Sequence, residues 1–128
     1  MSSLPGRKIL VVDDNVDSAQ SMAFVLRTLG HAADYISDPR RVVGAVRERK
    51  PDAVFLDIGM PHLDGYELAR LLKQENGDLC IVAISGHDSP EHRKRGREAG
   101  FDAHVAKPAD ADMLQSILVT IFGPRPPR

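Results

Sequence analysis

The sequence predicts an α/β protein in which five parallel strands form one doubly wound sheet, in the spatial order 2-1-3-4-5. Short uninterrupted apolar runs, typical of strands buried on both faces, alternate five times with segments of helical periodicity. Strand–helix repeats of this kind connect parallel strands by right-handed crossovers, so helices cover both faces of the sheet in a three-layer α/β/α arrangement. Most of the runs also stop at a polar residue, and the ends of such strands are where open α/β sheets bind ligands.

The length and composition indicate a single folded domain. The chain has 128 residues, of which 42% are hydrophobic and 27% charged, and its formal net charge of −1 argues against non-specific nucleic-acid binding. No apolar stretch approaches the roughly 20 residues of a membrane helix, and the N-terminus lacks a signal-peptide apolar region. The one cysteine, Cys80, cannot form an internal disulfide and is expected to be a small buried apolar residue. We therefore expect a cytoplasmic protein.

The first strand is expected at residues 9–13 and the first helix at 17–29. The second strand and the second helix are expected between residue 32 and Pro51. Gly30 is a stop signal for the first helix, and strand 32–36 alternates polar and apolar residues as an edge strand does. Asp38 followed by Pro39 is typical of a helix N-cap and its first residue. The positions expected to face the core from these two helices are Ala19, Met22, Ala23, Leu26, Val42, Val43 and Val46.

The remaining strands are expected at residues 53–57, 81–85 and 103–106, with helices at about 66–74, from Ser89-Pro90 onward, and at about 110–122. Asn76-Gly77 predicts the turn after the third helix. The positions expected to be buried in the third and fifth helices are Leu68, Leu71, Leu72, Leu114, Ile117, Leu118 and Ile121. Residues 1–7 are expected to be a disordered N-terminal tail and residues 123–128 a short, stiff Pro-rich tail, on either side of one domain at 8–122.

Three aspartates are predicted to converge at one edge of this sheet. Asp13 and Asp14 follow the first strand and Asp57 ends the third, and these strands are neighbours in the predicted order. Adjacent strands lie about 4.8 Å apart, so the carboxylates would disfavour one another's ionisation. A divalent cation relieves such crowding, and an all-oxygen ligand set suits Mg²⁺ rather than zinc.

Two further polar residues end strands beside this cluster. Lys107 follows the fifth strand, about 10 Å from Asp57, a gap that its long side chain can span. Its ammonium suits a phosphoryl oxygen, and Ser85 between them can donate a hydroxyl hydrogen bond. A carboxylate such as Asp57 can act as a nucleophile and become an aspartyl phosphate.

Four segments that carry these residues resemble the receiver domain of two-component response regulators. The segments are VVDDN at 11–15, FLDIGMPHLDG at 55–65, AISG at 83–86 and HVAKP at 104–108. The resemblance covers about residues 8–122 and implies a flavodoxin/CheY-like (βα)5 fold. It implies that Asp57 accepts a phosphoryl group from a phosphohistidine of a histidine kinase or histidine phosphotransfer protein, and that phosphorylation switches partner binding.

The resemblance also implies roles for the surrounding residues. Asp14 and Asp57 would bind Mg²⁺ directly together with the backbone carbonyl of Gly59, and Asp13 would act mostly through water. Ser85 and Lys107 would hold the phosphoryl group, and the peptide bond between Lys107 and Pro108 would be cis. Asp64 and Gly65 match the family loop, and we interpret them as turn and helix-start residues.

The output side of the molecule departs from the usual family pattern. The family often has Tyr or Phe where this chain has His104, so we hypothesise that His104 follows the movement of Ser85 with a pH-dependent output. Residues 91–98 of the fourth helix are basic and almost without an apolar face. An effector is expected on the face formed by helix four, strand five and helix five, where this helix presents either a solvated surface or a docking surface for an acidic partner.

Two other functions remain open at this stage. One is an Mg²⁺-dependent phosphohydrolase with Asp57 as nucleophile, although no stretch is long enough for a substrate-recognising cap. The other is an interaction module that works without phosphate. A conventional enzyme is not expected, but a receiver would catalyse its own phosphotransfer and dephosphorylation. Residues 100–108 (GFDAHVAKP) resemble receivers of hybrid histidine kinases somewhat more than those of transcription factors.

Overall fold

The computed structural model describes residues 6–61, 63–86 and 89–123. Most of the two expected tails, residues 1–5 and 124–128, lies outside the described residues. Arg7, which the sequence places in the first tail, donates its backbone N–H to Nδ1 of His31 at 3.0 Å. Its guanidinium carbon lies 4.2 Å from the centre of the Phe122 ring.

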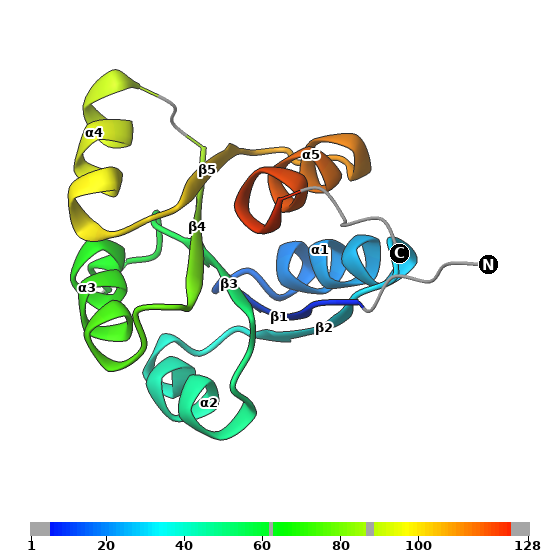
Figure 1. Ribbon diagram of the computed structural model, residues 1–128, viewed down its shortest axis with the longest axis horizontal. Coiled ribbons are helices and arrows are strands. Elements are labelled where there is room, and N and C mark those ends of the chain that lie inside the picture. Colours follow the sequence, from blue (N-terminus) through cyan, green and yellow to red (C-terminus); the bar gives the residue numbers. More distant parts are fainter. Residues whose placement is uncertain (1–5, 62, 87–88, 124–128) are drawn as a thin grey trace.

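Five parallel strands form a single sheet in the order β2-β1-β3-β4-β5 (Figure 1). This confirms the predicted fold class and strand order. The strands are β1 (Lys8–Val12), β2 (Ala32–Ile36), β3 (Ala53–Asp57), β4 (Cys80–Ser85) and β5 (Ala103–Ala106). β2 is an edge strand, as its alternating pattern predicts, whereas β3 is buried along its whole length.

The helices cover both faces of this sheet. They are α1 (Val16–Thr28), α2 (Val42–Arg49), α3 (Gly65–Glu75), α4 (Pro90–Ala99) and α5 (Ala111–Phe122), and a short 3-10 helix, η1 (Pro39–Arg41), precedes α2. α1 and α5 lie on one face, and α2, α3 and α4 lie on the other (Figure 1). The five strand–helix units and the three-layer arrangement are therefore as predicted, and most boundaries differ by at most two residues. The second helix is an exception, because the turn capped by Asp38 is the 3-10 helix η1 and α2 begins only at Val42.

Polar side chains determine where the helices begin. At every described helix start except that of α2, the N-cap side chain accepts a hydrogen bond from a backbone N–H of the first turn, which satisfies a donor that has no partner within the helix. The capping residues are Asn15 for α1, Asp38 for η1, Asp64 for α3, Ser89 for α4 and Asp110 for α5. Asp64 is thus a helix-start residue and Gly65 is the first residue of α3, as the sequence indicates.

Each face of the sheet has its own hydrophobic core. Phe55 packs with residues of α1 and α5 on one face, and Leu56 packs with residues of α2 and α3 on the other. Of the predicted core positions, Leu71 is wrong, because it is 42% exposed. Successive helical residues are rotated by about 100°, so the helix turns Leu71 outward while Leu68 and Leu72 face the sheet.

The carboxyl ends of the strands meet at one edge of the sheet. Asp13 lies one residue beyond β1, and its backbone N–H donates to the carbonyl of Ile36 at the end of β2. Asp57 ends β3 opposite Ile84, one residue before Ser85 on the neighbouring strand. Ser85 in turn lies opposite Ala106, the residue before Lys107. The register therefore brings the predicted polar residues to the same edge.

Candidate functional site

Three carboxylates gather at this edge. One oxygen from each of Asp13, Asp14 and Asp57 lies within 4.8 Å of the others. Asp13 and Asp57 are buried, whereas Asp14 is exposed beside them. The strand order brings these residues together, because Asp13 and Asp14 follow β1 and Asp57 ends the adjacent β3.

Asp13 is the most deeply buried member of the cluster, with a side chain that is 4% exposed. Its Oδ1 accepts a hydrogen bond from the backbone N–H of Asn15 at 3.0 Å, and its Oδ2 accepts one from Nζ of Lys107 at 3.0 Å. Burial raises the pKa of the Asp13 carboxyl, and the hydrogen bonds from Asn15 and Lys107 offset this only in part. The negative charge at this position is therefore costly without further compensation.

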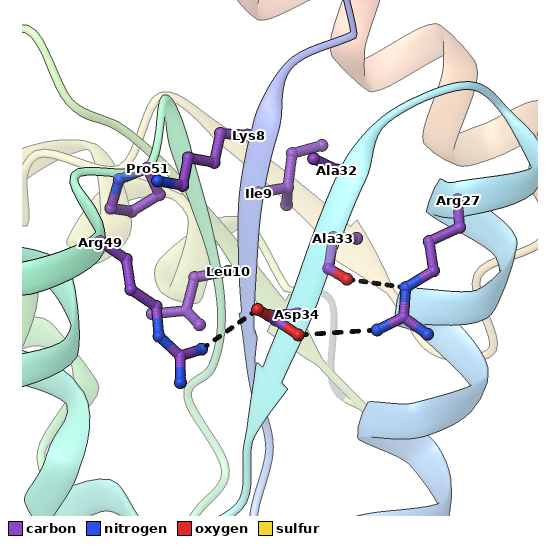
Figure 2. Close-up of a pocket in the computed structure, with 9 residues that line it drawn as sticks. All are labelled: Lys8, Ile9, Leu10, Arg27, Ala32, Ala33, Asp34, Arg49 and Pro51. Carbon is purple, nitrogen blue, oxygen red and sulfur yellow. Dashed lines mark hydrogen bonds and ion pairs between the residues drawn. The ribbon is translucent and has the colours of Figure 1, made fainter.

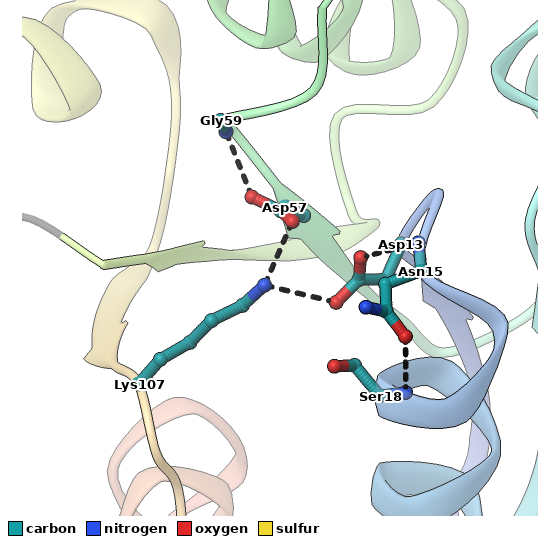
Figure 3. A network of polar contacts seen from close by, with 6 residues as sticks. All are labelled: Asp13, Asn15, Ser18, Asp57, Gly59 and Lys107. Atoms are coloured by element: carbon teal, nitrogen blue, oxygen red, sulfur yellow. Dashed lines mark hydrogen bonds and ion pairs between the residues drawn. The ribbon is translucent and has the colours of Figure 1, made fainter.

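Asp57 has a donor on each of its oxygens. Oδ1 accepts from the backbone N–H of Gly59 at 2.7 Å, and Oδ2 accepts from Nζ of Lys107 at 2.9 Å (Figure 3). A Cβ built on Gly59 would lie 3.3 Å from Oδ1 of Asp57, which is closer than most real Cβ contacts. A side chain at residue 59 would therefore crowd the Asp57 carboxylate.

Lys107 joins the two buried carboxylates. Its side chain extends from the end of β5 so that a single ammonium contacts both Asp13 and Asp57 (Figure 3). Burial acts to lower the pKa of Lys107, but the hydrogen bonds to Asp57 and Asp13 outweigh it, and the pKa is raised. The amine is therefore charged at neutral pH. The peptide bond between Lys107 and Pro108 is cis.

Ser85 and His104 occupy the strands beside this cluster. Ser85 is buried at the end of β4, and its carbonyl accepts a hydrogen bond from the backbone N–H of Lys107 at 2.9 Å. His104 is half-buried on β5, two residues before Ala106, the register partner of Ser85. It borders a cavity of about 280 Å³ that Arg93 and Arg97 of α4 also line.

Asn15 has a structural role that the sequence motifs do not reveal. Its backbone N–H holds Asp13, and its side-chain oxygen accepts from the backbone N–H of Ser18 at 3.1 Å, which caps α1 (Figure 3). The sequence does carry a signal for this role, because an asparagine directly before an apolar helical pattern is a typical N-cap. The start of α1 and the orientation of Asp13 are thus set by the same residue.

The donor set fits a hard divalent cation. All three side chains of the cluster are carboxylates, and the described residues that approach them contribute backbone N–H groups and one ammonium. Oxygen-only sites with few protein ligands suit Mg²⁺, which keeps several waters. The ammonium of Lys107 balances one negative charge, and so the three carboxylates leave an excess that a cation would neutralise.

The fold and this edge together define the class: a flavodoxin-like α/β protein with an acidic site at the carboxyl ends of its parallel strands. Residues 9–119 match the response regulator receiver domain family. The chain therefore belongs to the receiver domains of two-component response regulators, as the motifs of the sequence indicate.

Individual relatives agree with this assignment. The response regulator MprA of Mycolicibacterium vanbaalenii is 37% identical over 101 residues, which are 79% of this chain and 44% of that protein. The chain thus spans less than half the length of the curated relatives it matches.

Solved structures show the same fold. A CheY-like receiver domain from Methylobacillus flagellatus has a TM-score of 0.80 and 31% identity over 91% of this chain and 98% of its own. The chemotaxis protein CheY4 of Vibrio cholerae has a TM-score of 0.85 over the same shares, and its 22% identity supports the fold alone. No helix in the described part of the chain is both long and apolar enough to cross a membrane.

Proposed function

We propose that this receiver domain accepts a phosphoryl group on Asp57 and acts as a phosphorylation-controlled switch in two-component signalling. The observation that carries the proposal is the position of Lys107, whose Nζ lies within hydrogen-bonding distance of Asp57 and Asp13 beside three clustered carboxylates. An acceptor, a fixed cation and an acidic cluster are the parts that phosphoryl transfer requires, because it depends mainly on positioning and charge neutralisation.

In this proposal the Asp57 carboxylate is the nucleophile. One of its oxygens forms a bond to phosphorus while the bond between phosphorus and the imidazole nitrogen of a phosphohistidine breaks, and the imidazole keeps the electron pair. Lys107 then interacts with the oxygens of the transferred group, and the hydroxyl of Ser85 donates to another of them. The donor would be a histidine kinase or a histidine phosphotransfer protein. Water attack on the aspartyl phosphate, catalysed by the domain itself, would reverse the modification.

Asp14 and Asp57 would hold Mg²⁺ directly, with the carbonyl of Gly59 as a third protein ligand and Asp13 acting through water. The support is the cluster of carboxylate oxygens and the burial that makes the charge of Asp13 costly. When bound, the cation neutralises the negative charge that accumulates on the phosphoryl oxygens. Gly59 has no side chain that would crowd the Asp57 carboxylate.

The output would involve His104 and the face formed by α4, β5 and α5. A half-buried side chain on β5, adjacent to the strand of Ser85, can change position when Ser85 binds a phosphoryl oxygen. We expect His104→Phe to change both partner affinity and its pH dependence, because phenylalanine cannot be protonated. Unchanged affinity at every pH would remove His104 from the switch.

The decisive test is mass spectrometry of the protein after incubation with Mg²⁺ and a small phosphodonor. Wild type should gain one hydroxylamine-labile phosphate, Asp57→Asn should gain none, and Asp64→Asn, which alters an exposed aspartate of the same loop, should behave as wild type. Rapid multiple turnover of small phosphomonoesters would instead indicate a phosphohydrolase. Failure of wild type to take up phosphate would favour an interaction module that works without it.

A further inference from the structure

A second pocket lies at the other end of the sheet from the acidic cluster. It has a volume of about 330 Å³ and is bordered by the first residues of β1, by β2, and by the segment that leads from α2 into β3. Lys8 begins β1, whereas Asp13 follows its end, so about 17 Å of strand separates the two sites. The proposed phosphotransfer therefore does not involve this pocket.

Two arginines flank a single carboxylate in this pocket, and the pocket is also lined by Lys8. Lys8 and Arg49 lie on the α2 side of β1, and Arg27 reaches Asp34 from α1, on the far side of β2 (Figure 2). Asp34 pairs with Arg27 at 3.6 Å and with Arg49 at 3.5 Å. These distances exceed the 2.7–2.9 Å or so of close charge-assisted hydrogen bonds, so Asp34 holds both arginines only loosely. The pocket keeps an excess of positive charge.

The arginines also retain hydrogen-bond donors. Arg27 is positioned by its Nε, which donates to the carbonyl of Ala33 at 2.8 Å, and one further nitrogen faces Asp34. Arg49 directs one terminal nitrogen to Asp34. Since a guanidinium carries five N–H groups in a planar fork, each arginine can donate to another anion without leaving its present position.

The remaining wall of the pocket is apolar. Leu10, Ala32 and Pro51 line it between the cationic groups (Figure 2). Its volume falls within the range of small-molecule sites, which combine an apolar lining with a few converging polar groups. A simple inorganic anion would leave this apolar surface without a contact, and a neutral apolar molecule would leave the guanidiniums without a partner.

We propose that this pocket binds a small organic anion, with its carboxylate or phosphate group between Arg27 and Arg49 and its apolar part against Leu10 and Pro51. Asp34 occupies the anion position in the free protein and competes with the ligand for the two arginines. This site is independent of phosphorylation, and the receiver function can fail without affecting it.

The test is an NMR titration of the wild-type protein in EDTA with four probes: phenyl phosphate, benzoate, inorganic phosphate and benzyl alcohol. We expect saturable shifts of the backbone amides of Lys8, Asp34 and Arg49, with those of Asp13 and Asp57 unaffected. At least one organic anion should bind at least five-fold more tightly than inorganic phosphate and benzyl alcohol. The better of phenyl phosphate and benzoate identifies the preferred head group.

Three variants separate a built site from general surface charge. Arg49→Gln and Arg27→Gln should each weaken binding of the organic anion at least five-fold, and Asp34→Asn should tighten it about three-fold or more because the competing carboxylate is gone. Arg70→Gln, at an exposed position of α3 that does not line the pocket, should leave it unchanged. Equal binding of inorganic phosphate, equal weakening by Arg70→Gln, or no saturable shift around Asp34 would each overturn the proposal.

Discussion

At the scale of single residues, the site concentrates negative charge where water is scarce. Asp13 and Asp57 are both nearly inaccessible, and one ammonium serves both of them. Burial raises the free energy of an ionised carboxylate, so their charges are tolerated because Lys107 and backbone N–H groups compensate them. The proposed function and the stability of the domain would therefore depend on the same few atoms, and substitutions there should affect both.

Asp13→Asn should stabilise the protein at neutral pH in the absence of divalent cations. The folded-state pKa of Asp13 is raised, so its contribution to stability is fully present below its unfolded pKa and is lost as pH rises through the folded pKa. The variant in EDTA should therefore melt about 3–5 °C above wild type at pH 7.5, which corresponds to about 1 kcal/mol.

This difference should shrink as the pH falls toward the ordinary aspartate pKa of 3.8. Asp14→Asn is the control, because it removes an exposed carboxylate of the same cluster and should have a smaller effect. An Asp13→Asn protein that melts at or below the wild-type temperature at pH 7.5 would contradict the assigned cost of that charge.

Lys107→Met should have the opposite effect on stability. It leaves two buried carboxylates without their ammonium, and because the lysine side chain is 34% exposed we expect a loss of about 1–2 kcal/mol rather than the full cost of breaking a buried pair. Phosphorylation by a small donor should slow about 10²-fold, as when one charge-stabilising donor is removed from an active site.

Urea denaturation and the rate of mass gain measure these two effects of Lys107→Met. Adding Asp13→Asn to Lys107→Met should recover most of the lost stability, since the two positions interact directly. Strictly additive changes would show that the contact contributes nothing to folding.

The sequence identifies the residues of the site but not the contacts among them. Apolar runs that stop at aspartates, at Ser85 and before Lys107 were sufficient to predict that these residues meet at one edge. Lys107 contacts both Asp13 and Asp57, and Asn15 donates a hydrogen bond to Asp13. These contacts depend on side-chain conformation, which residue spacing does not predict. The directions of the pKa shifts depend on burial and could not be predicted either.

At the scale of elements, local signals predicted helix starts well and helix faces less well. N-cap residues act on the next few backbone N–H groups, so Asp38, Asp64 and Ser89 could be identified from the chain alone. Leu71 was assigned wrongly because its neighbours, not its hydrophobicity, decide which side of α3 meets the sheet. Tertiary packing selects one face among several that the spacing permits.

α4 has little apolar contact with the rest of the domain. Its buried residues are Gly96 and Ala99, and Arg95 lies over the ring of Tyr66 with its guanidinium carbon 4.3 Å from the centroid. A glycine in a helix interior costs about 1 kcal/mol relative to alanine. The element that carries most of the proposed output surface is therefore weakly held by its own sequence.

Gly96→Ala should stabilise the protein by about 1 kcal/mol, equivalent to about 3–5 °C in melting temperature. A Cβ at residue 96 would meet Phe101 at 3.4 Å, which is ordinary van der Waals contact. The backbone amides of α4 should also exchange their hydrogens more slowly in this variant, which would show that the added stability lies in α4.

Gly100→Ala is the matched control for Gly96→Ala and should destabilise the protein. Gly100 has a φ of +105°, and its added Cβ would lie 3.1 Å from Cγ of Lys73. If both substitutions changed the stability in the same direction, the conformational preference of glycine would not explain the weakness of α4.

At the scale of the whole molecule, the topology follows from the alternation of strands and helices, and the topology places the site. Parallel strands linked by right-handed crossovers direct all carboxyl ends to one edge, so residues up to 94 positions apart in the chain come into contact. The pocket around Asp34 was not predictable, because it depends on how far α2 extends over the sheet and how Arg27 reaches around β2.

Mg²⁺ should stabilise the entire domain, because a ligand that binds only the folded state shifts the unfolding equilibrium. For a site of about millimolar affinity, a ten-fold excess over the dissociation constant gives about 1.4 kcal/mol. The urea midpoint of wild type should rise accordingly and return to its starting value with EDTA. Asp57→Asn should show a much smaller rise, and an undiminished rise in that variant would place the cation elsewhere.

The contact between Arg7 and Phe122 has a consequence for how such a domain can be combined with others. The chain enters β1 and leaves α5 at neighbouring points, so the domain can be spliced into a loop of a host protein without stretching either junction. Grafted in this way, it would be tethered at a single spot, and the rim that carries Asp57 would stay open to a visiting donor.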